Sequence, residues 1–214
     1  MIFSQISSLD LILSDGIKGG TITEISGLRG TGKTQLALQF AIEPLKKNET
    51  VYFIDTTVEF RPERFLEILQ SRNLSKDLLE NLHVSHVSNI QQQKDILSKI
   101  NEENFSLLII DNISDLFSFE FSEKQYFVER NTYFSTYVLQ LSKIALLKNI
   151  PIIITNQVLN KSEKNYRRMS EFLENHIHQK IQLEKIKNHY SGIIDSPFID
   201  KQQFDYKITK LGIE

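Results

Sequence analysis

Residues 27–34, GLRGTGKT, are the feature that most restricts how this 214-residue chain can fold. They match the pattern G-x-x-x-x-G-K-[ST], follow the strand-like segment TITEISG at 21–27 and precede a run at 34–45 with helical apolar spacing. A strand, a glycine-rich turn and a helix in this order form a phosphate-binding loop, in which backbone N–H groups and the helix N-terminus face an anion. The sequence therefore predicts a nucleotide-binding α/β domain.

The residue types in this loop predict an ATP and Mg²⁺ site. Lys33 places a positive charge at the β- and γ-phosphates, and Thr34 offers a hydroxyl to Mg²⁺. The three glycines allow backbone angles that point N–H groups into a concave anion nest. The residues expected to contact the nucleotide are Gly27, Leu28, Arg29, Gly30, Thr31, Gly32, Lys33, Thr34 and Gln35.

A second acidic position completes the predicted metal site. Asp111 ends the apolar run LLIID, and a buried strand with one carboxylate at its C-terminal tip is typical of the acid that holds Mg²⁺ through water. Thr34 and Asp111 are therefore the expected metal residues. The strand-like run VYFID at 51–55 lies between the two motifs, which is the layout of RecA-like and AAA-type ATPases.

Strand-like and helix-like runs alternate along most of the chain. Strands are expected at 21–27, 51–55, 82–87, 105–112 and 151–158, and helices at 34–45, 61–72, 90–100 and 132–147. This alternation predicts an α/β fold with a mostly parallel central sheet flanked by helices on both faces. Alternating polarity at 178–194, a turn at 195–200 and a final strand at 204–214 predict an antiparallel C-terminal extension, while 113–128 is expected to be irregular and 160–176 a mobile loop.

Composition excludes several classes of site. The chain has 25 Lys and Arg against 27 Asp and Glu, so a generally basic nucleic-acid-binding surface is excluded, although a local basic patch is not. The absence of cysteine excludes disulfides, thiolate zinc sites and cysteine nucleophiles. The five histidines lack carboxylate-rich or cysteine partners, so structural roles are expected for them. With no signal peptide and no apolar run long enough to span a membrane, a cytoplasmic location, or a nuclear one in a eukaryote, is expected.

Five blocks in order along the chain resemble the RecA/RadA recombinase family, on its archaeal and eukaryotic branch. The blocks are GGTITEISGLRGTGKTQLALQF, YFIDTTVEFRPERF, LLIIDNISDLF, IIITNQV and IIDSPFID. The resemblance covers nearly the whole chain and implies a RecA-like P-loop ATPase core. Because no repeat, linker or second core is evident, residues 1–214 are expected to form a single domain without the helical DNA-binding domain that precedes the core in full-length recombinases.

The resemblance also implies roles for individual residues. Arg64 would stack on adenine, as guanidinium planes do on aromatic faces. Gln157 would sense the γ-phosphate, and Asp195 would cap the nucleotide of a neighbouring subunit. Residues 118–130 and 159–176 match the positions of the family's two DNA-binding loops. The first is acidic, whereas the second carries the expected single-stranded DNA contacts Lys161, Lys164, Tyr166, Arg167 and Arg168.

The chain departs from the family where the catalytic glutamate belongs. That glutamate lies two residues after the strand-end aspartate, but here Asp55 is followed by Thr56 and Thr57. A hydroxyl cannot accept a proton from water at neutral pH as a carboxylate does. Glu59 lies two positions further on and is the candidate substitute; the other usual location, directly after Asp111, holds Asn112. Lys33, Glu59 and Gln157 are therefore the expected catalytic residues, and ATP binding is better supported than hydrolysis.

These features predict a core-only recombinase paralogue of the RadB type. It would bind ATP and Mg²⁺, contact single-stranded DNA, assist a recombinase or paralogue subunit in homologous recombination and DNA repair, and hydrolyse ATP weakly. Two alternatives stay open. One is a KaiC-like regulatory ATPase acting on proteins, which the acidic loop at 118–130 favours. The other is a non-hydrolysing structural subunit of a paralogue complex, for which the missing glutamate speaks.

Overall fold

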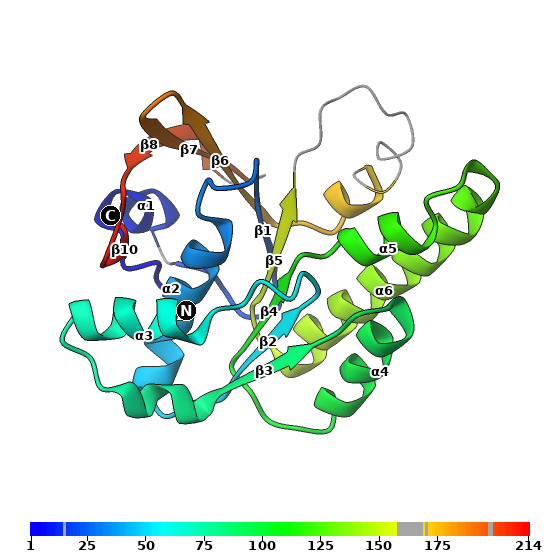
Figure 1. Ribbon diagram of the computed structural model, residues 1–214, viewed down its shortest axis with the longest axis horizontal. Coiled ribbons are helices and arrows are strands. Elements are labelled where there is room, and N and C mark those ends of the chain that lie inside the picture. The colour runs from blue at the N-terminus through cyan, green and yellow to red at the C-terminus, as the bar shows by residue number, and fades with distance from the viewer. Residues whose placement is uncertain (15, 158–168, 170, 197–198) are drawn as a thin grey trace.

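A central sheet with helices on both faces forms the body of the molecule (Figure 1). The computed structural model describes residues 1–14, 16–157, 169, 171–196 and 199–214. Within these residues the main sheet has eight strands in the order β3-β2-β4-β5-β1-β6-β7-β8. The strands are β1 (Ile22–Gly27), β2 (Val51–Asp55), β3 (Leu82–His86), β4 (Leu107–Asp111), β5 (Ile152–Gln157), β6 (Gln179–Ile186), β7 (His189–Ser196) and β8 (Ile199–Tyr206).

Parallel pairing dominates the sheet, as expected from the alternation of strands and helices. The pairs β3–β2, β2–β4, β4–β5, β5–β1 and β1–β6 are parallel, and β6–β7 and β7–β8 are antiparallel. A separate ribbon pairs β9 (Ile208–Thr209) with β10 (Gly212–Ile213). The predicted fold class, a mostly parallel sheet with an antiparallel C-terminal extension, is confirmed.

Two layers of helices bury the two faces of the sheet (Figure 1). One layer contains α1 (Ser7–Leu13), α2 (Lys33–Lys46) and α3 (Pro62–Ser71), and the other contains α4 (Ile90–Ile100), α5 (Asp115–Glu120) and α6 (Phe127–Lys148). Neighbouring strand residues alternate between the two cores, because side chains of a strand point to opposite faces. Phe53 and Ile109 lie in the first core, and Ile54 and Ile110 lie in the second.

The segment 113–128 is more regular than its sequence indicates. It contains α5 and the 3-10 turn η2 (Lys124–Tyr126), and α6 already begins at Phe127. The Phe117 ring packs edge-on against Phe134 at 5.2 Å between centroids and lies 5.7 Å from the Tyr137 ring, all three being buried. Helices as short as α5 leave little periodicity in a sequence, and tertiary packing stabilises them instead. A second 3-10 helix, η1 (Lys76–Asn81), precedes β3.

The C-terminal third also departs from the sequence-based expectation in detail. Asp195 and Ser196 belong to β7, and β8 begins at Ile199, so both ends of the expected turn at 195–200 are strand residues. Residues 197 and 198 lie outside the described range. Within the expected loop 160–176, residues 171–174 are helical and Leu173 is buried in the second core. No helix among the described residues is long and apolar enough to cross a membrane.

Candidate nucleotide-binding site

The motif residues meet at one edge of the sheet because their strands are parallel and in register. Gly27 at the end of β1 pairs with Gln157 at the end of β5, and Asp55 at the end of β2 pairs with Asp111 at the end of β4. Ligands of open α/β sheets bind beyond the carboxyl ends of such strands. The strand register thus brings together groups that lie up to 130 positions apart in the sequence.

The phosphate loop joins β1 to α2, which begins at Lys33. Gly30 and Gly32 have φ angles of 79° and 95°, in the left-handed region that favours glycine. Thr31 ties the loop to its surroundings: its hydroxyl donates to the Leu28 carbonyl at 2.8 Å, and its own carbonyl accepts from the Tyr206 hydroxyl at 2.6 Å. These two hydrogen bonds fix the conformation of the loop, one from within the loop and one from β8.

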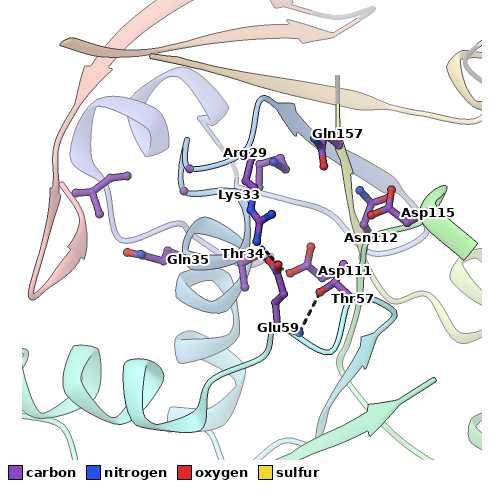
Figure 2. Close-up of a pocket in the computed structure, with 13 residues that line it drawn as sticks. Arg29, Lys33, Thr34, Gln35, Thr57, Glu59, Asp111, Asn112, Asp115 and Gln157 are labelled. Carbon is purple, nitrogen blue, oxygen red and sulfur yellow. Dashed lines mark hydrogen bonds and ion pairs between the residues drawn. The ribbon is translucent and has the colours of Figure 1, made fainter. Parts of the chain in front are cut away.

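A pocket of about 450 Å³ lies in front of the phosphate loop (Figure 2). The residues predicted from the sequence that line it are Arg29, Gly30, Gly32, Lys33, Thr34, Gln35, Glu59, Asp111 and Gln157. Gly27, Leu28 and Thr31 shape the loop without lining the pocket. The pocket therefore combines the phosphate loop with the tips of β4 and β5.

Thr34 and Asp111, the predicted metal residues, are already in contact. The Thr34 hydroxyl donates to Oδ2 of Asp111 at 2.5 Å, and the Thr155 hydroxyl donates to Oδ1. Burial raises the pKa of Asp111, and Asp55 raises it further, whereas the two hydroxyls and Lys33 lower it. A buried carboxylate beside a hydroxyl is a donor set that suits Mg²⁺, whose charge would offset the cost of burying the acid. The residues present therefore fit the metal, which Thr34 and Asp111 would hold.

Lys33 contributes a positive charge to the pocket, in addition to that of Arg29. Its ammonium donates to the Leu28 carbonyl at 3.0 Å. Burial lowers the pKa of Lys33, while the charges of Asp111, Asp115 and Glu59 oppose that shift. These three acids all line the pocket, and their negative charges favour the charged form of the lysine.

Neither of the two usual positions for the catalytic carboxylate holds one, although Thr57 and Asn112 both line the pocket. The Thr57 hydroxyl donates to Asp55 at 2.9 Å, and Asp55 also accepts from the Phe60 backbone at 3.0 Å. Glu59, the candidate substitute, forms an ion pair with Arg29 of the phosphate loop (Figure 2). The Glu59 side chain is 59% exposed, so this pair lies on the solvent side of the pocket.

Two predicted nucleotide contacts from outside the phosphate loop, Arg64 and Asp195, do not line the pocket either. Arg64 donates to Gln35 at 2.9 Å and also contacts Glu67 and the Thr209 carbonyl, so its guanidinium joins α3 to α2 and β9 behind the pocket. Asp195 is exposed on β7, opposite Lys180 in the strand register. Adenine stacking by Arg64 and capping of a neighbouring nucleotide by Asp195 stay predictions.

The five residues predicted to contact DNA, Lys161, Lys164, Tyr166, Arg167 and Arg168, lie outside the described residues. The described part of the other predicted loop, 118–130, is largely helical. All five histidines contact other residues. His86 lies 3.0 Å from Asp55, His178 lies 3.2 Å from the Ile22 backbone and His189 lies 3.0 Å from Asp205. His176 lies 3.0 Å from the Phe172 carbonyl, and the His83 ring packs edge-on against Tyr52.

Sequence reasoning missed two residues of the pocket, Asp115 and Ile208. Asp115 begins α5, four residues after Asp111 and inside the segment expected to be irregular. The acid itself was the available signal, since it stands close behind a strand-end aspartate. Ile208 comes from β9, and nothing in the local sequence connects it with the phosphate loop.

Comparison with known proteins agrees with this geometry. The model of the Rad51 family matches residues 1–214. The chain is 26% identical over 235 residues to a "DNA repair and recombination protein RadA" of Methanococcus maripaludis strain C5, covering 96% of this chain and 73% of that protein. It is 27% identical over 238 residues to the protein of the same name from strain S2, covering 97% of this chain and 74% of the relative. Because the family model matches residues 1–214, the chain belongs to the Rad51 family.

Proposed function

We propose that this chain is an ATP-binding accessory protein of homologous recombination and DNA repair, of the RadB type. In this role it binds ATP with Mg²⁺, contacts single-stranded DNA and assists a RecA/RadA-family recombinase or a paralogue subunit. Its own ATP hydrolysis is weak. The observation that carries the proposal is the pocket in which the phosphate loop meets the Thr34–Asp111 pair at the carboxyl edge of the sheet.

ATP binding follows from the chemistry of that pocket. The phosphate loop contributes N–H groups and the charge of Lys33 toward an anion, and Thr34 with Asp111 would hold Mg²⁺. When bound, the metal supplies charge that neutralises the phosphates. Gln157 lies on the same side of the pocket as Asn112 (Figure 2), and in this proposal its amide senses the γ-phosphate.

Weak hydrolysis follows from the side chains at the two usual carboxylate positions, Thr57 and Asn112. Positioned proton transfer contributes about 10²- to 10⁴-fold to such reactions, so its loss leaves binding in place and slows turnover. Lys33 and Gln157 remain to stabilise and sense the γ-phosphate. Glu59 lies two residues beyond the usual position at Thr57, and its carboxylate forms an ion pair with Arg29.

The proposed partners follow from the family rather than from the pocket. The relatives are named as DNA repair and recombination proteins, which supports a role in those processes. Basic side chains would contact the phosphate backbone of DNA, and an aromatic ring would stack on its bases. The basic residues are Lys161, Lys164, Arg167 and Arg168, and the aromatic one is Tyr166. Asp195 would complete the nucleotide site of a neighbouring subunit, so ATP would join this chain to its partner.

The test measures three properties of the same protein: ATP affinity, single-stranded DNA affinity as a function of salt, and ATP turnover with and without DNA. We expect Mg²⁺-dependent ATP binding, salt-sensitive DNA binding and slow turnover. Neutralising Lys161, Lys164 and Arg168 together should reduce the salt slope by about 0.7 for each phosphate that is no longer bound. Absence of DNA binding at low salt would contradict the accessory role and favour a regulatory ATPase acting on proteins.

A second candidate is a structural subunit that binds ATP without turning it over. Thr57 and Asn112 in the pocket favour it. In this case turnover stays at background with and without DNA, while ATP still stabilises the assembly with a partner. Turnover above background that depends on Lys33 would exclude it.

A further inference from the structure

Asp115 is a pocket acid without a partner among the described residues. It is the first residue of α5 and lines the same pocket as Lys33 and Gln157. Figure 2 shows its side chain beside Asn112, on the side of the pocket where Gln157 lies. No hydrogen bond or ion pair joins the Asp115 carboxylate to any other residue that the structure describes.

The other acids around the pocket are engaged. Asp111 accepts from Thr34 and Thr155, and Glu59 is paired with Arg29. Asp55 is fully buried and accepts hydrogen bonds from the backbone and hydroxyl of Thr57. Among the described acids near the phosphate loop, Asp115 therefore combines a place in the pocket with a carboxylate that is free to accept a proton.

The turn that carries Asp115 is held rigidly. The Asn112 side-chain oxygen accepts from the Ser114 backbone at 2.9 Å, and the Ser114 hydroxyl lies 2.9 Å from the Asn156 side-chain oxygen. The Asn112 backbone is joined to the Thr56 hydroxyl through both its N–H, at 2.8 Å, and its carbonyl, at 2.7 Å. The amide oxygen of Asn112 is therefore used as a hydrogen-bond acceptor within the turn that positions Asp115.

The surroundings of Asp115 also make it a better proton acceptor than an exposed aspartate. Burial raises the pKa of Asp115, and the negative charges of Asp111 and Glu59 add to that effect, while Lys33 opposes it. A carboxylate whose pKa is raised toward the working pH accepts a proton more readily in the transition state.

We propose that Asp115, and not Glu59, is the general base for ATP hydrolysis in this pocket. The inference rests on the proposed ATP-binding function. An oxygen of the Asp115 carboxylate takes a proton from a water molecule while the water oxygen bonds to the γ-phosphorus. The bond from that phosphorus to the bridging oxygen breaks, and its electron pair stays on ADP. Asp115 then releases the proton to solvent, leaving ADP and inorganic phosphate.

The experiment compares Asp115→Asn, Glu59→Gln and the exposed control Asp77→Asn in single-turnover ATP hydrolysis, with ATP affinity measured separately. Asp115→Asn should lower the rate at least about tenfold, and up to the 10²- to 10⁴-fold that general-base catalysis contributes. ATP affinity should be equal or higher in Asp115→Asn, because a negative charge near the phosphates is removed. The acidic limb of the pH–rate profile should be lost in Asp115→Asn and kept in Asp77→Asn.

A second variant tests the role of Asp115 as general base by a gain of ATP turnover rather than a loss. Thr57→Glu places a carboxylate at the family's usual position, so adding it to Asp115→Asn should restore turnover at least tenfold over Asp115→Asn alone. A larger loss in Glu59→Gln than in Asp115→Asn, or no turnover above background in the unchanged protein, would overturn the assignment to Asp115 while leaving ATP binding intact. Failure to bind ATP at all would overturn the proposed function as well.

Discussion

The hydroxyl of Thr34 donates a 2.5 Å hydrogen bond to Oδ2 of Asp111, although 77 residues separate the two positions. This bond joins the start of α2 to the end of β4 at the carboxyl edge of the sheet. The hydroxyl and the carboxylate are the groups that would hold Mg²⁺, and they are brought together by the protein alone. The strand register and the phosphate loop therefore bring the two predicted metal residues into contact.

Replacing Lys33 with alanine tests the electrostatic basis of ATP binding. Hydrogen bonds to a charged group contribute about 1.5–3 kcal/mol, so the Kd for ATP should rise on the order of ten- to hundredfold. Titration with a fluorescent ATP analogue measures this change. Lys46→Ala, at the exposed end of α2, is the matched control and should leave the Kd unchanged. Equal affinities in the two variants would show that Lys33 does not face the phosphates.

Asp111→Asn tests the cost of the buried carboxylate. Because the pKa of Asp111 is raised in the folded protein, the native state binds more protons than the unfolded state, and the free energy of unfolding falls as pH rises above about 3.8. Without Mg²⁺ and ATP at neutral pH, the asparagine variant should melt at a higher temperature than the unchanged protein. Each kcal/mol corresponds to about 2–4 °C for a chain of this size.

Adding Mg²⁺ and ATP should reverse that order, since only the unchanged protein gains the full stabilisation from binding. Differential scanning calorimetry between pH 4 and pH 8 follows both effects, with the exposed Asp200→Asn as control. A variant that melts below the unchanged protein at every pH, with and without ligand, would contradict this account.

Tyr206→Phe tests the link between β8 and the phosphate loop. The variant removes the 2.6 Å hydrogen bond to the Thr31 carbonyl and leaves that carbonyl buried without its donor. The expected cost is about 1–3 kcal/mol of stability, with ATP binding a few-fold weaker because the loop is less well held. Burial raises the pKa of Tyr206, so the difference should persist across the neutral and mildly alkaline range.

Tyr190→Phe is the matched control for that prediction. Tyr190 packs against Tyr206 with 5.4 Å between ring centroids, yet its hydroxyl makes no hydrogen bond with any described residue. The Tyr190→Phe variant should therefore have the same stability and the same ATP affinity as the unchanged protein. If both phenylalanine variants behave alike, ring packing and not the hydrogen bond supports the loop.

Gly192→Ala tests packing in the antiparallel extension. Gly192 pairs with Phe204 across β7 and β8, and a Cβ at Gly192 would lie 2.2 Å from the tip of the buried Phe204 ring. Overpacking of this kind costs about 1–3 kcal/mol. Combining Gly192→Ala with Phe204→Leu should cost less than the sum of the two single changes, which urea unfolding can measure. Additive effects of the two changes would show that the ring does not meet the new methyl group.

The sequence predicted the phosphate loop and the parallel strands well, because both depend on local patterns. Gly30 and Gly32 mark a turn that needs left-handed angles, and the apolar run ending at Asp111 marks a buried strand. Local sequence patterns predicted less where long-range packing determines the structure. Phe117 stabilises the short helix α5 by contacting rings of α6, and β9 adds Ile208 to the pocket from the far end of the chain.

By itself, the sequence determined the type of site: a phosphate loop, a strand-end acid and the absence of glutamate at positions 57 and 112. Only the tertiary structure decided which carboxylate remains available. Glu59 pairs with Arg29 and Asp55 is enclosed by its own turn, whereas Asp115 faces the pocket without a partner among the described residues. The physical reason is that availability depends on which donors fold against each acid. Those donors come from other strands and loops, whose distances are set by the sheet register and not by the spacing of residues along the chain.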